Sequence, residues 1–228
     1  MTRVACVAIA AVLLLLAWQG ARLAWPRGEL RDYGSFIASG RAAAEGLNPY
    51  GIYPLTFHVV IGRIDLHNPN LNPPLSVLPL QVLGRLDPVS SFAGWWIFSL
   101  ACYVVAVALL ARRYGAGAGG LLVPWALALA GFWDTLVLGQ IYLPLVLCAV
   151  CAWLLLDRGR TVAAGLLIGV VVAMKPNFAT WPAILLLAGH RRAALSAVAS
   201  ACALSLLPLL AHGAEIYRQW FALIASDG

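Results

Sequence analysis

The stretch Gly-Leu-Leu-Ile-Gly-Val-Val-Val-Ala-Met-Lys-Pro-Asn, residues 165–177, carries the single lysine of this 228-residue chain, Lys175, at the end of an apolar segment. An ammonium group is costly to bury in hydrocarbon, so a lone lysine in this position is expected to face a water-filled cavity or an anion. A carboxylate, Asp32, follows the first apolar segment of the chain in the same way. The topology described below places both groups at one face of a membrane, an arrangement suited to chemistry on a lipid phosphate.

The composition is that of an integral membrane protein. Hydrophobic residues make up 62% of the chain and charged residues 11%, whereas a soluble domain has roughly 25% charged residues. The formal net charge of +6 does not indicate nucleic-acid binding, because membrane proteins carry basic loops for topological reasons and no run of Lys and Arg is long enough for a DNA-binding face. The lipid bilayer is therefore a predicted partner and nucleic acid is not. The five cysteines all lie in apolar segments, where cysteine behaves as a small hydrophobe, so no disulfide framework is expected.

Apolar segments long enough to cross or nearly cross a bilayer recur along the chain. They cover residues 4–26, 89–111, 119–138, 141–156, 161–174, 178–189 and 193–211. A helix that crosses the bilayer perpendicular to its plane needs about 20 residues, so the two segments on either side of Pro176 are short. Short or broken helices are tolerated in membrane proteins where their backbone lines a cavity. The first segment is longer than the roughly 7–15 apolar residues of a signal peptide and is expected to stay uncleaved. The predicted fold is an all-α integral membrane protein in which residues 1–228 form one polytopic domain of about seven transmembrane helices.

Short basic connections set the predicted orientation. Under this segmentation they fall on one side, which the positive-inside rule makes cytoplasmic. They contain Arg3, Arg112-Arg113, Arg158, Arg160 and Arg191-Arg192. The outer side then holds the loop 27–88, the Gly139-Gln140 turn, Lys175-Pro176-Asn177 and the tail 212–228. This orientation requires the proline-rich piece 73–86 to lie at the outer surface or dip into the membrane without crossing it. We expect a multi-pass protein of the cell membrane (inner or plasma) with its site on the extracytoplasmic face.

The outer loop 27–88 is long enough to contain juxtamembrane helices. From Asp32 to Leu47, apolar side chains recur at near-helical spacing, which predicts an amphipathic helix at the membrane interface. Its polar surface is expected to carry Ser35, Ser39, Arg41 and Glu45. A second cluster of turn-forming residues, 68–74, combines three asparagines with three prolines.

Three charged residues each allow two interpretations. Asp32 is either the N-cap of the interfacial helix or a general base that serves an acceptor hydroxyl at the membrane surface. Lys175 is either a snorkelling anchor or a phosphate ligand, with Arg31 and Arg63 as candidate assisting cations. Asp134, inside a predicted span, is either a hydrated surface group or a candidate second acid.

The sequence does not contain the motifs of several other enzyme classes. His58 and His67 lie in the outer loop without clustered ligands, so no metal site is expected. The chain contains no Walker loop, dinucleotide fingerprint, G-x-S-x-G motif or zinc-protease motif. We therefore expect neither a cofactor nor cytoplasmic nucleotide-sugar chemistry.

A series of short motifs runs through nearly the whole chain in order. It comprises Asp32-Tyr33, Gly46-Leu-Asn-Pro-Tyr50, Asn72-Pro-Pro-Leu75 with Pro79-Leu80, Gly139-Gln-Ile-Tyr142, Gly165-Leu-Leu-Ile-Gly169 with Lys175-Pro176, and Arg191-Arg192. Each motif alone is weakly specific. Their order and spacing together resemble the polyprenyl-phosphate-mannose-dependent α-mannosyltransferases of glycosyltransferase family 87, within the multi-spanning GT-C superfamily.

The resemblance implies transfer of a hexose, typically mannose, from a polyprenyl-phosphate donor to an extracytoplasmic acceptor, which can be a glycolipid, a glycan or a protein. Asp32 would be the general base and Lys175 would bind the donor phosphate. The residues implied as substrate-binding are Tyr33, Asn48, Tyr50, Asn72, Gln140, Lys175 and Asn177. Such enzymes generally invert the anomeric centre in one displacement, without a metal or cofactor.

The resemblance also implies a longer protein, because members of the family usually continue with further spans. We therefore expect this chain to be the N-terminal part of a larger enzyme. The alternatives are a flippase for polyprenol-linked sugars, another lipid-linked transporter, or an inactive truncated fragment. Transporters often show paired repeats. This chain shows none, and its candidate residues lie toward one face, which favours the enzyme.

Overall fold

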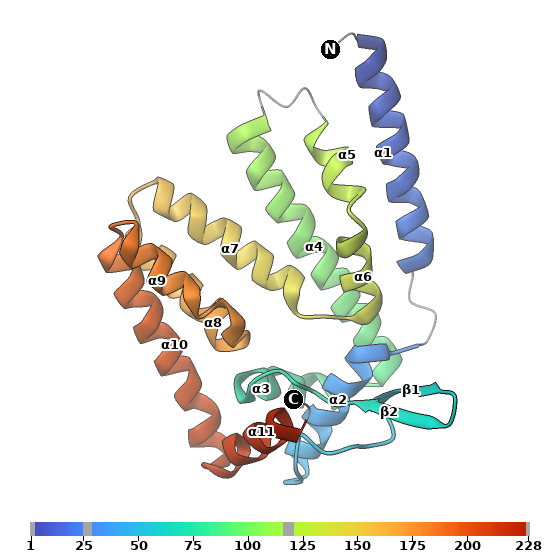
Figure 1. Ribbon diagram of the computed structural model, residues 1–228, viewed down its shortest axis with the longest axis vertical. Helices are drawn as coiled ribbons and strands as arrows, with labels where there is room; N and C mark the ends of the chain where they lie inside the picture. Colours follow the sequence, from blue (N-terminus) through green and yellow to red (C-terminus); the bar gives the residue numbers. More distant parts are fainter. Residues whose placement is uncertain (1–2, 25–28, 116–120, 227–228) are drawn as a thin grey trace.

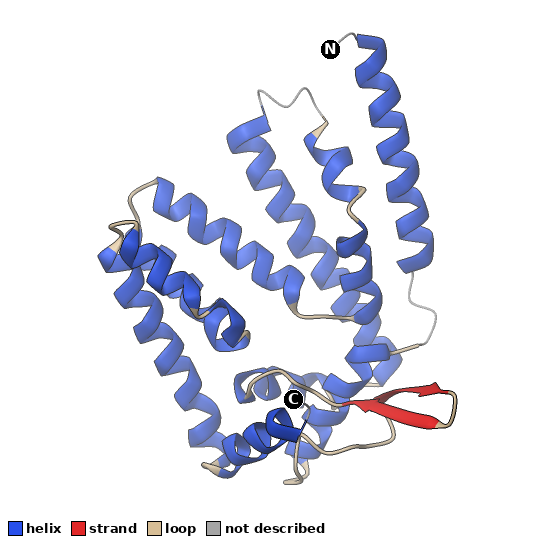
Figure 2. Cartoon of the chain, viewed as in Figure 1, coloured by secondary structure: helices blue, strands red, loops and turns tan. Residues whose placement is uncertain are grey.

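The computed structural model describes residues 3–24, 29–115 and 121–226 and is mostly helical (Figures 1 and 2). Its α-helices are α1 (Arg3–Ala24), α2 (Arg31–Ala44), α3 (Val77–Leu83), α4 (Pro88–Tyr114), α5 (Leu122–Leu127), α6 (Ala130–Leu138), α7 (Tyr142–Asp157), α8 (Thr161–Met174), α9 (Thr180–Leu187), α10 (Arg191–His212) and α11 (Glu215–Ser226). Two 3₁₀ turns, η1 (Pro74–Ser76) and η3 (Pro176–Phe178), precede α3 and α9. One antiparallel hairpin pairs β1 (Phe57–Ile61) with β2 (Ile64–Asn68).

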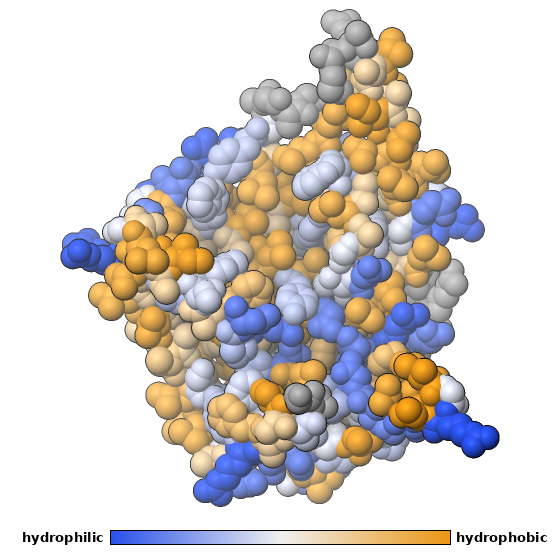
Figure 3. Space-filling view, in the orientation of Figure 1, coloured by the Kyte–Doolittle hydropathy of each residue, from blue (hydrophilic) through white to orange (hydrophobic). Residues whose placement is uncertain are grey.

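The elements form two layers. The long apolar helices run side by side, and a lower layer of α2, the hairpin, α3 and α11 lies across their ends (Figure 1). Within the described residues, three helices are long and apolar enough to cross a membrane: Val4–Ala24, Pro88–Tyr114 and Arg191–His212. The visible face is hydrophobic over α1, whereas hydrophilic residues gather toward the lower layer (Figure 3). The chain is therefore a helical membrane protein, as predicted, while the count of about seven spans stays a prediction.

The predicted span 119–138, of which residues 121–138 are described, is not one helix. It is divided into α5 and α6, with an extended residue at Leu129 between them. Backbone carbonyls freed by such a break must find partners inside a membrane protein. The Tyr103 hydroxyl donates to the Ala126 oxygen at 2.8 Å, and Trp133 Nε1 donates to the Leu127 oxygen at 2.8 Å. The sequence did not predict the break between α5 and α6, because the Tyr103 hydroxyl that binds one of these carbonyls comes from a position 23 residues away.

The helices α8 and α10 pack closely through small residues. A Cβ added at Gly169 would lie 2.6 Å from the Ala197 oxygen, and one added at Gly165 would collide with Ser196 and with the Ala193 carbonyl. Glycine is therefore required on this face of α8 if the two backbones are to approach this closely. The contact fixes α8, and with it Lys175, against α10.

The connections predicted to be cytoplasmic share one end of the structure. Arg113 Nε in the last turn of α4 binds Asp157 Oδ2 at the end of α7 at 2.9 Å. The described start of α1, the α7–α8 turn and the α9–α10 turn lie toward this same end (Figure 1). The lower layer lies at the opposite end, and the end of α8 that precedes Lys175 points toward it (Figure 1). This arrangement agrees with the predicted segregation of segments, while the side of the cell to which each end faces stays a prediction.

The predicted interfacial helix is present as α2, but two of its polar side chains, Ser35 and Ser39, are buried. Ser35 and Ser39 are 2% and 1% exposed. Ser35 Oγ donates to the Asn68 oxygen at 2.6 Å, and Asn70 Nδ2 donates to Ser39 Oγ at 3.0 Å. The expectation of an open polar surface was wrong for these two residues, because the loop after β2 covers that face of α2.

Two elements of the lower layer were not predicted, namely the β1–β2 hairpin and α11. The helix α11 lies in the predicted tail, where Trp220 Nε1 donates to the Leu71 oxygen at 3.2 Å and Tyr217 Oη donates to the Ser205 oxygen at 2.5 Å. The piece predicted to stay at the surface, 73–86, forms η1 and α3. The apolar helix Pro74–Leu83 is shorter than the helices that qualify as spans.

Candidate functional site

Asp32 lies in the first turn of α2 and does not cap it. The N-cap is Leu30, and no side chain caps the helix. The two Asp32 oxygens are held by two different amides: Asn68 Nδ2 donates to Oδ1 at 3.0 Å, and Gln140 Nε2 donates to Oδ2. The residue is 8% exposed. The N-cap interpretation is therefore wrong, and the carboxylate is instead fixed in place by two neutral donors.

The backbone beside Asp32 is strained. Arg31 has φ of 44°, and it is the non-glycine residue with positive φ among those the structure describes. The left-handed region costs such a residue about 1–2 kcal/mol, and strain of this kind concentrates at functional sites. The Arg31 side chain pairs with Glu29 at 3.3 Å.

Gly139 brings Gln140 to Asp32. It ends α6 with φ of 69°, and a Cβ at this position would lie 2.6 Å from Tyr33 Cβ. Only a glycine therefore lets the α6–α7 turn close against α2. Trp95 Nε1 donates to the Gly139 oxygen at 2.9 Å and holds the turn.

Tyr33 supports this contact from inside the protein. It is fully buried, and its hydroxyl shares a hydrogen bond of 2.7 Å with Ser91 Oγ. Burial raises the pKa of the Tyr33 phenol, so the hydroxyl stays protonated and neutral. Its aromatic ring packs against the rings of Phe92 and Trp95. Tyr33 thus anchors the start of α2, which carries Asp32, in the core of the protein.

Lys175 reaches the same region from α8. The helix ends at Lys175, whose backbone is extended before Pro176, and its Nζ lies 4.6 Å from the centroid of the Tyr142 ring. Such a cation–π contact orients the ammonium without neutralising it. No carboxylate of the described residues forms an ion pair with Lys175. Because Tyr142 follows Gln140 by two residues, the α6–α7 turn connects the carboxylate of Asp32 with the ammonium of Lys175.

Asn48, Tyr50 and Asn72 form a separate cluster near the other end of α2. The Tyr50 hydroxyl donates to the Asn72 oxygen at 3.3 Å, and the Tyr50 amide donates to Asn48 Oδ1 at 2.9 Å. Asn72 Nδ2 donates to Asn70 Oδ1 at 2.9 Å, and Asn70 in turn binds Ser39. Ser39 follows Asp32 by two helical turns, about 10 Å along the axis. The structure does not bring these predicted substrate-binding residues next to Asp32.

The remaining predicted residues are exposed. Asn177 lies in η3, two residues beyond Lys175. Asp134 is exposed on α6 and makes no hydrogen bond or ion pair with the residues the structure describes, so its role as a second acid stays a prediction. Arg63 is exposed at the turn of the hairpin. The His58 and His67 rings stack with centroids 5.6 Å apart, and no group of three metal-binding side chains occurs within the described part of the chain.

The sequence did not identify two residues that contact the proposed charged groups, Asn68 beside Asp32 and Tyr142 beside Lys175. Asn68 stood in the predicted turn cluster and Tyr142 in the Gly139–Tyr142 motif, but neither was assigned a role. The signal for Asn68 was weak, because the cluster holds three asparagines and only one of them faces Asp32.

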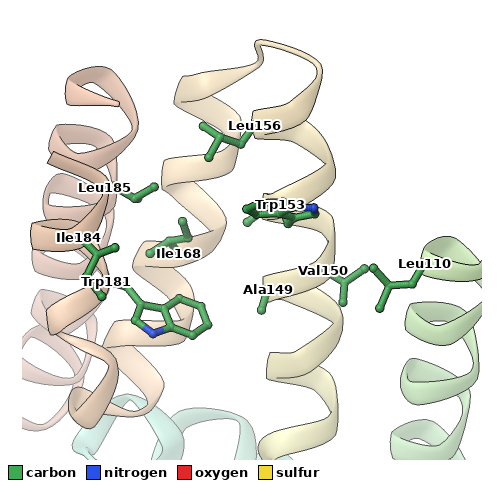
Figure 4. A pocket seen from close by; sticks show the side chains of 10 residues that line it. Leu110, Ala149, Val150, Trp153, Leu156, Ile168, Trp181, Ile184 and Leu185 are labelled. Carbon is green, nitrogen blue, oxygen red and sulfur yellow. The ribbon is translucent and has the colours of Figure 1, made fainter. Parts of the chain in front are cut away.

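An apolar cavity of about 410 Å³ lies between α7, α8 and α9, with Leu110 of α4 at its edge (Figure 4). Ten apolar residues line it, and Trp153 and Trp181 contribute the aromatic rings. On α8 it begins at Ile168, seven residues before Lys175 and therefore about 10 Å from it along the helix. The Trp181 ring touches that of Phe178 in η3, with centroids 5.0 Å apart. The cavity thus lies among the apolar helices, on the side of the Lys175 turn that faces away from the lower layer.

The comparisons with known proteins identify the family of the chain. The model of glycosyltransferase family 87 matches residues 70–227. The matched part contains Gln140, Tyr142 and Lys175, whereas Asp32 precedes it. Searches of curated proteins and of solved structures find no match. Since the family model covers more than half of the chain, the protein belongs to glycosyltransferase family 87, a family of glycosyltransferases.

Proposed function

We propose that this glycosyltransferase transfers a hexose, with mannose as the first candidate, from a polyprenyl-phosphate donor to a hydroxyl group of an extracytoplasmic acceptor. Two contacts of one turn carry the proposal. Gln140, with Asn68, holds the Asp32 carboxylate, and Tyr142, two residues after Gln140, contacts the Lys175 ammonium. A base and a cation at one end of a membrane helix bundle are the two groups that such a transfer requires. Membership of a glycosyltransferase family favours an enzyme over a transporter.

In the proposed reaction Asp32 accepts the proton of the acceptor hydroxyl. A carboxylate offers about four lone-pair sites, and the two amides occupy one on each oxygen, so sites remain for the acceptor. The acceptor oxygen forms a bond to the anomeric carbon of the sugar while the bond from that carbon to the phosphate oxygen breaks. The polyprenyl phosphate leaves with the electron pair, and a single displacement of this kind inverts the anomeric centre.

Lys175 would stabilise the charge that develops on the leaving phosphate. Its ammonium is oriented by Tyr142 and forms no ion pair with a carboxylate of the described residues, so it can bind an anion of the substrate. The apolar cavity between α7, α8 and α9 (Figure 4) is suited to an isoprenoid chain that enters from the lipid. A phosphate and an apolar chain together define a lipid-linked donor.

Replacement of Asp32 by asparagine tests the base. Asn is isosteric with Asp and can keep both hydrogen bonds if one neighbouring amide flips, so the variant removes the base alone. We expect transfer to fall by about 10²- to 10⁴-fold, the usual contribution of general-base catalysis. Asp87→Asn is the matched control, since Asp87 caps α4 from the same layer and asparagine is also a good cap. Turnover per molecule near that of the control would exclude Asp32 as the base.

Two variants of Lys175 test the donor phosphate. Lys175→Ala is expected to weaken use of the donor by about 10- to 100-fold, as for a charge-assisted hydrogen bond of about 1.5–3 kcal/mol. Lys175→Arg keeps the charge with a different geometry and is expected to lose less. The measurements are donor KM and kcat in membranes, normalised to the amount of protein. A snorkelling anchor would instead lower protein levels and leave both constants unchanged.

A further inference from the structure

The base of the β1–β2 hairpin is bonded to α2 through one serine. Ser35 follows Asp32 by one helical turn, and its hydroxyl is engaged twice. It donates to the Asn68 oxygen at 2.6 Å and accepts from the Phe57 amide at 2.9 Å. Phe57 and Asn68 are cross-strand partners, the first residue of β1 and the last of β2. Ser35 therefore ties both strands of the hairpin to the helix that carries Asp32.

Asn68 is restrained at its backbone as well as at its side chain. It precedes Pro69, and a residue before proline is confined to extended conformations. Its backbone oxygen is held by Ser35, while its Nδ2 reaches back to Asp32 Oδ1 at 3.0 Å. Two hydrogen bonds, one to Asp32 and one to Ser35, thus join Asn68 to α2 and leave its side-chain amide little freedom to turn away.

We propose that Asn68, held by Ser35, is a positioning residue that sets the orientation of the Asp32 carboxylate for proton transfer. The inference rests on the proposed function, in which Asp32 is the base. Gln140 fixes Oδ2 from the α6–α7 turn, and Asn68 fixes Oδ1 from the hairpin. Two donors from different elements define the plane of the carboxylate, whereas one donor would leave it free to rotate. Small displacements of a catalytic group cost about 10²-fold in rate.

The structure supplies a matched control one turn further along α2. Ser39 is buried to the same degree as Ser35, and its hydroxyl accepts a hydrogen bond from Asn70 Nδ2 at 3.0 Å. Asn70 has no bond to Asp32 and donates from Nδ2 only to Ser39. Loss of Ser39 therefore removes a buried hydrogen bond between the same loop and the same helix without releasing the carboxylate.

The test compares Asn68→Leu, Ser35→Ala and Ser39→Ala in the full chain. Asn68→Leu keeps the shape of the side chain and removes the donor, and we expect kcat to fall by about 10- to 100-fold with unchanged KM for donor and acceptor. Ser35→Ala should lower kcat less, and the double variant Ser35→Ala/Asn68→Leu should be no slower than Asn68→Leu, because Ser35 acts through Asn68. Ser39→Ala should lower the melting temperature and leave kcat unchanged.

Two outcomes would overturn the inference. One is an Asn68→Leu enzyme with normal kcat, and the other is additive losses in the double variant. If Asn68→Leu does not accumulate, Asn68→Asp replaces it, since it places an acceptor where the Asp32 oxygen needs a donor and should cause the same loss of kcat. The Asp32→Asn variant separates the two proposals. If it is active, the proposed function fails; if it is inactive while Asn68→Leu and Asn68→Asp are normal, only the positioning role fails.

Discussion

Replacement of Gly169 by alanine probes the contact of α8 with α10, which holds the segment that ends at Lys175. The added Cβ would lie 2.4 Å from Ser200 Cβ and 2.6 Å from the Ala197 oxygen, whereas ordinary van der Waals contacts of a Cβ begin at 3.4 Å. Rotation of the Ser200 side chain moves its hydroxyl but not its Cβ, and the Ala197 oxygen belongs to the α10 backbone. The two helices must therefore separate. A gap of roughly 0.5–1 Å already forfeits a quarter to a half of the dispersion energy of each facing atom pair.

The expected magnitude follows from two opposing effects. Overpacking costs about 1–3 kcal/mol, and the short contacts at Gly169 place this substitution in the upper part of that range, at about 2–3 kcal/mol. Alanine recovers up to about 1 kcal/mol of helix propensity relative to glycine. The net destabilisation is about 1–2 kcal/mol, which corresponds to a fall in Tm of about 2–8 °C for a chain of this size. Gly94→Ala in α4 is the matched control, because nothing lies within 4 Å of its added Cβ. This control keeps only the favourable effect, so its Tm should be unchanged or higher.

The assay is thermal unfolding of both purified variants and the parent chain in one detergent, followed by near-ultraviolet circular dichroism. Opposite signs for the two substitutions are the expected result. If Gly169→Ala unfolds at the temperature of the parent or above it, or shifts as Gly94→Ala does, the close α8–α10 contact is absent and the reasoning fails.

Three further perturbations follow from the structure. Ala149→Trp, which fills the cavity of about 410 Å³, should raise KM for a long-chain polyprenyl donor and leave KM for a short-chain water-soluble donor unchanged; equal effects on both would remove the cavity as the chain site. Asp87→Ala removes the hydrogen bond from the Ser90 amide at the start of α4 and should lower Tm at neutral pH. Because bonds from Ser90 hold the pKa of Asp87 below its usual value, this difference should vanish as the pH falls through that lowered pKa, and its persistence in acid would refute the cap. In a cysteine-free background, an impermeant maleimide applied outside the cell should label Arg63→Cys and not Gly159→Cys; the reverse pattern would place the site on the cytoplasmic face.

The membrane class and most of the helices could be predicted from the sequence. Long apolar segments must form helices in lipid because no water is present to satisfy the backbone, which is why α1, α4, α7, α8 and α10 lie close to their expected limits. Local chemistry also placed the end of α8 at Lys175, since Pro176 cannot continue the hydrogen-bonding pattern of the helix.

The motifs around Asp32, Gln140 and Lys175 marked the residues of the site without showing how they meet. The amides that hold Asp32 come from positions 36 and 108 residues away in the chain. No periodicity relates positions so far apart, and only the close packing of Gly139 on Tyr33 brings the second amide into reach. For the same reason the sequence allowed a cap at Asp32, while the structure leaves the end of α2 without one.

The sequence by itself therefore determined that this is a membrane protein, where its apolar helices lie and which family it resembles. These properties depend on composition and on residues that are neighbours in the chain. Tertiary structure decided the break between α5 and α6, the burial of Ser35 and Ser39, and the partners of the Asp32 carboxylate. Each of these depends on a hydrogen bond between residues that are distant in the chain. Such bonds form only once the helices have packed, and so they leave no local pattern in the sequence.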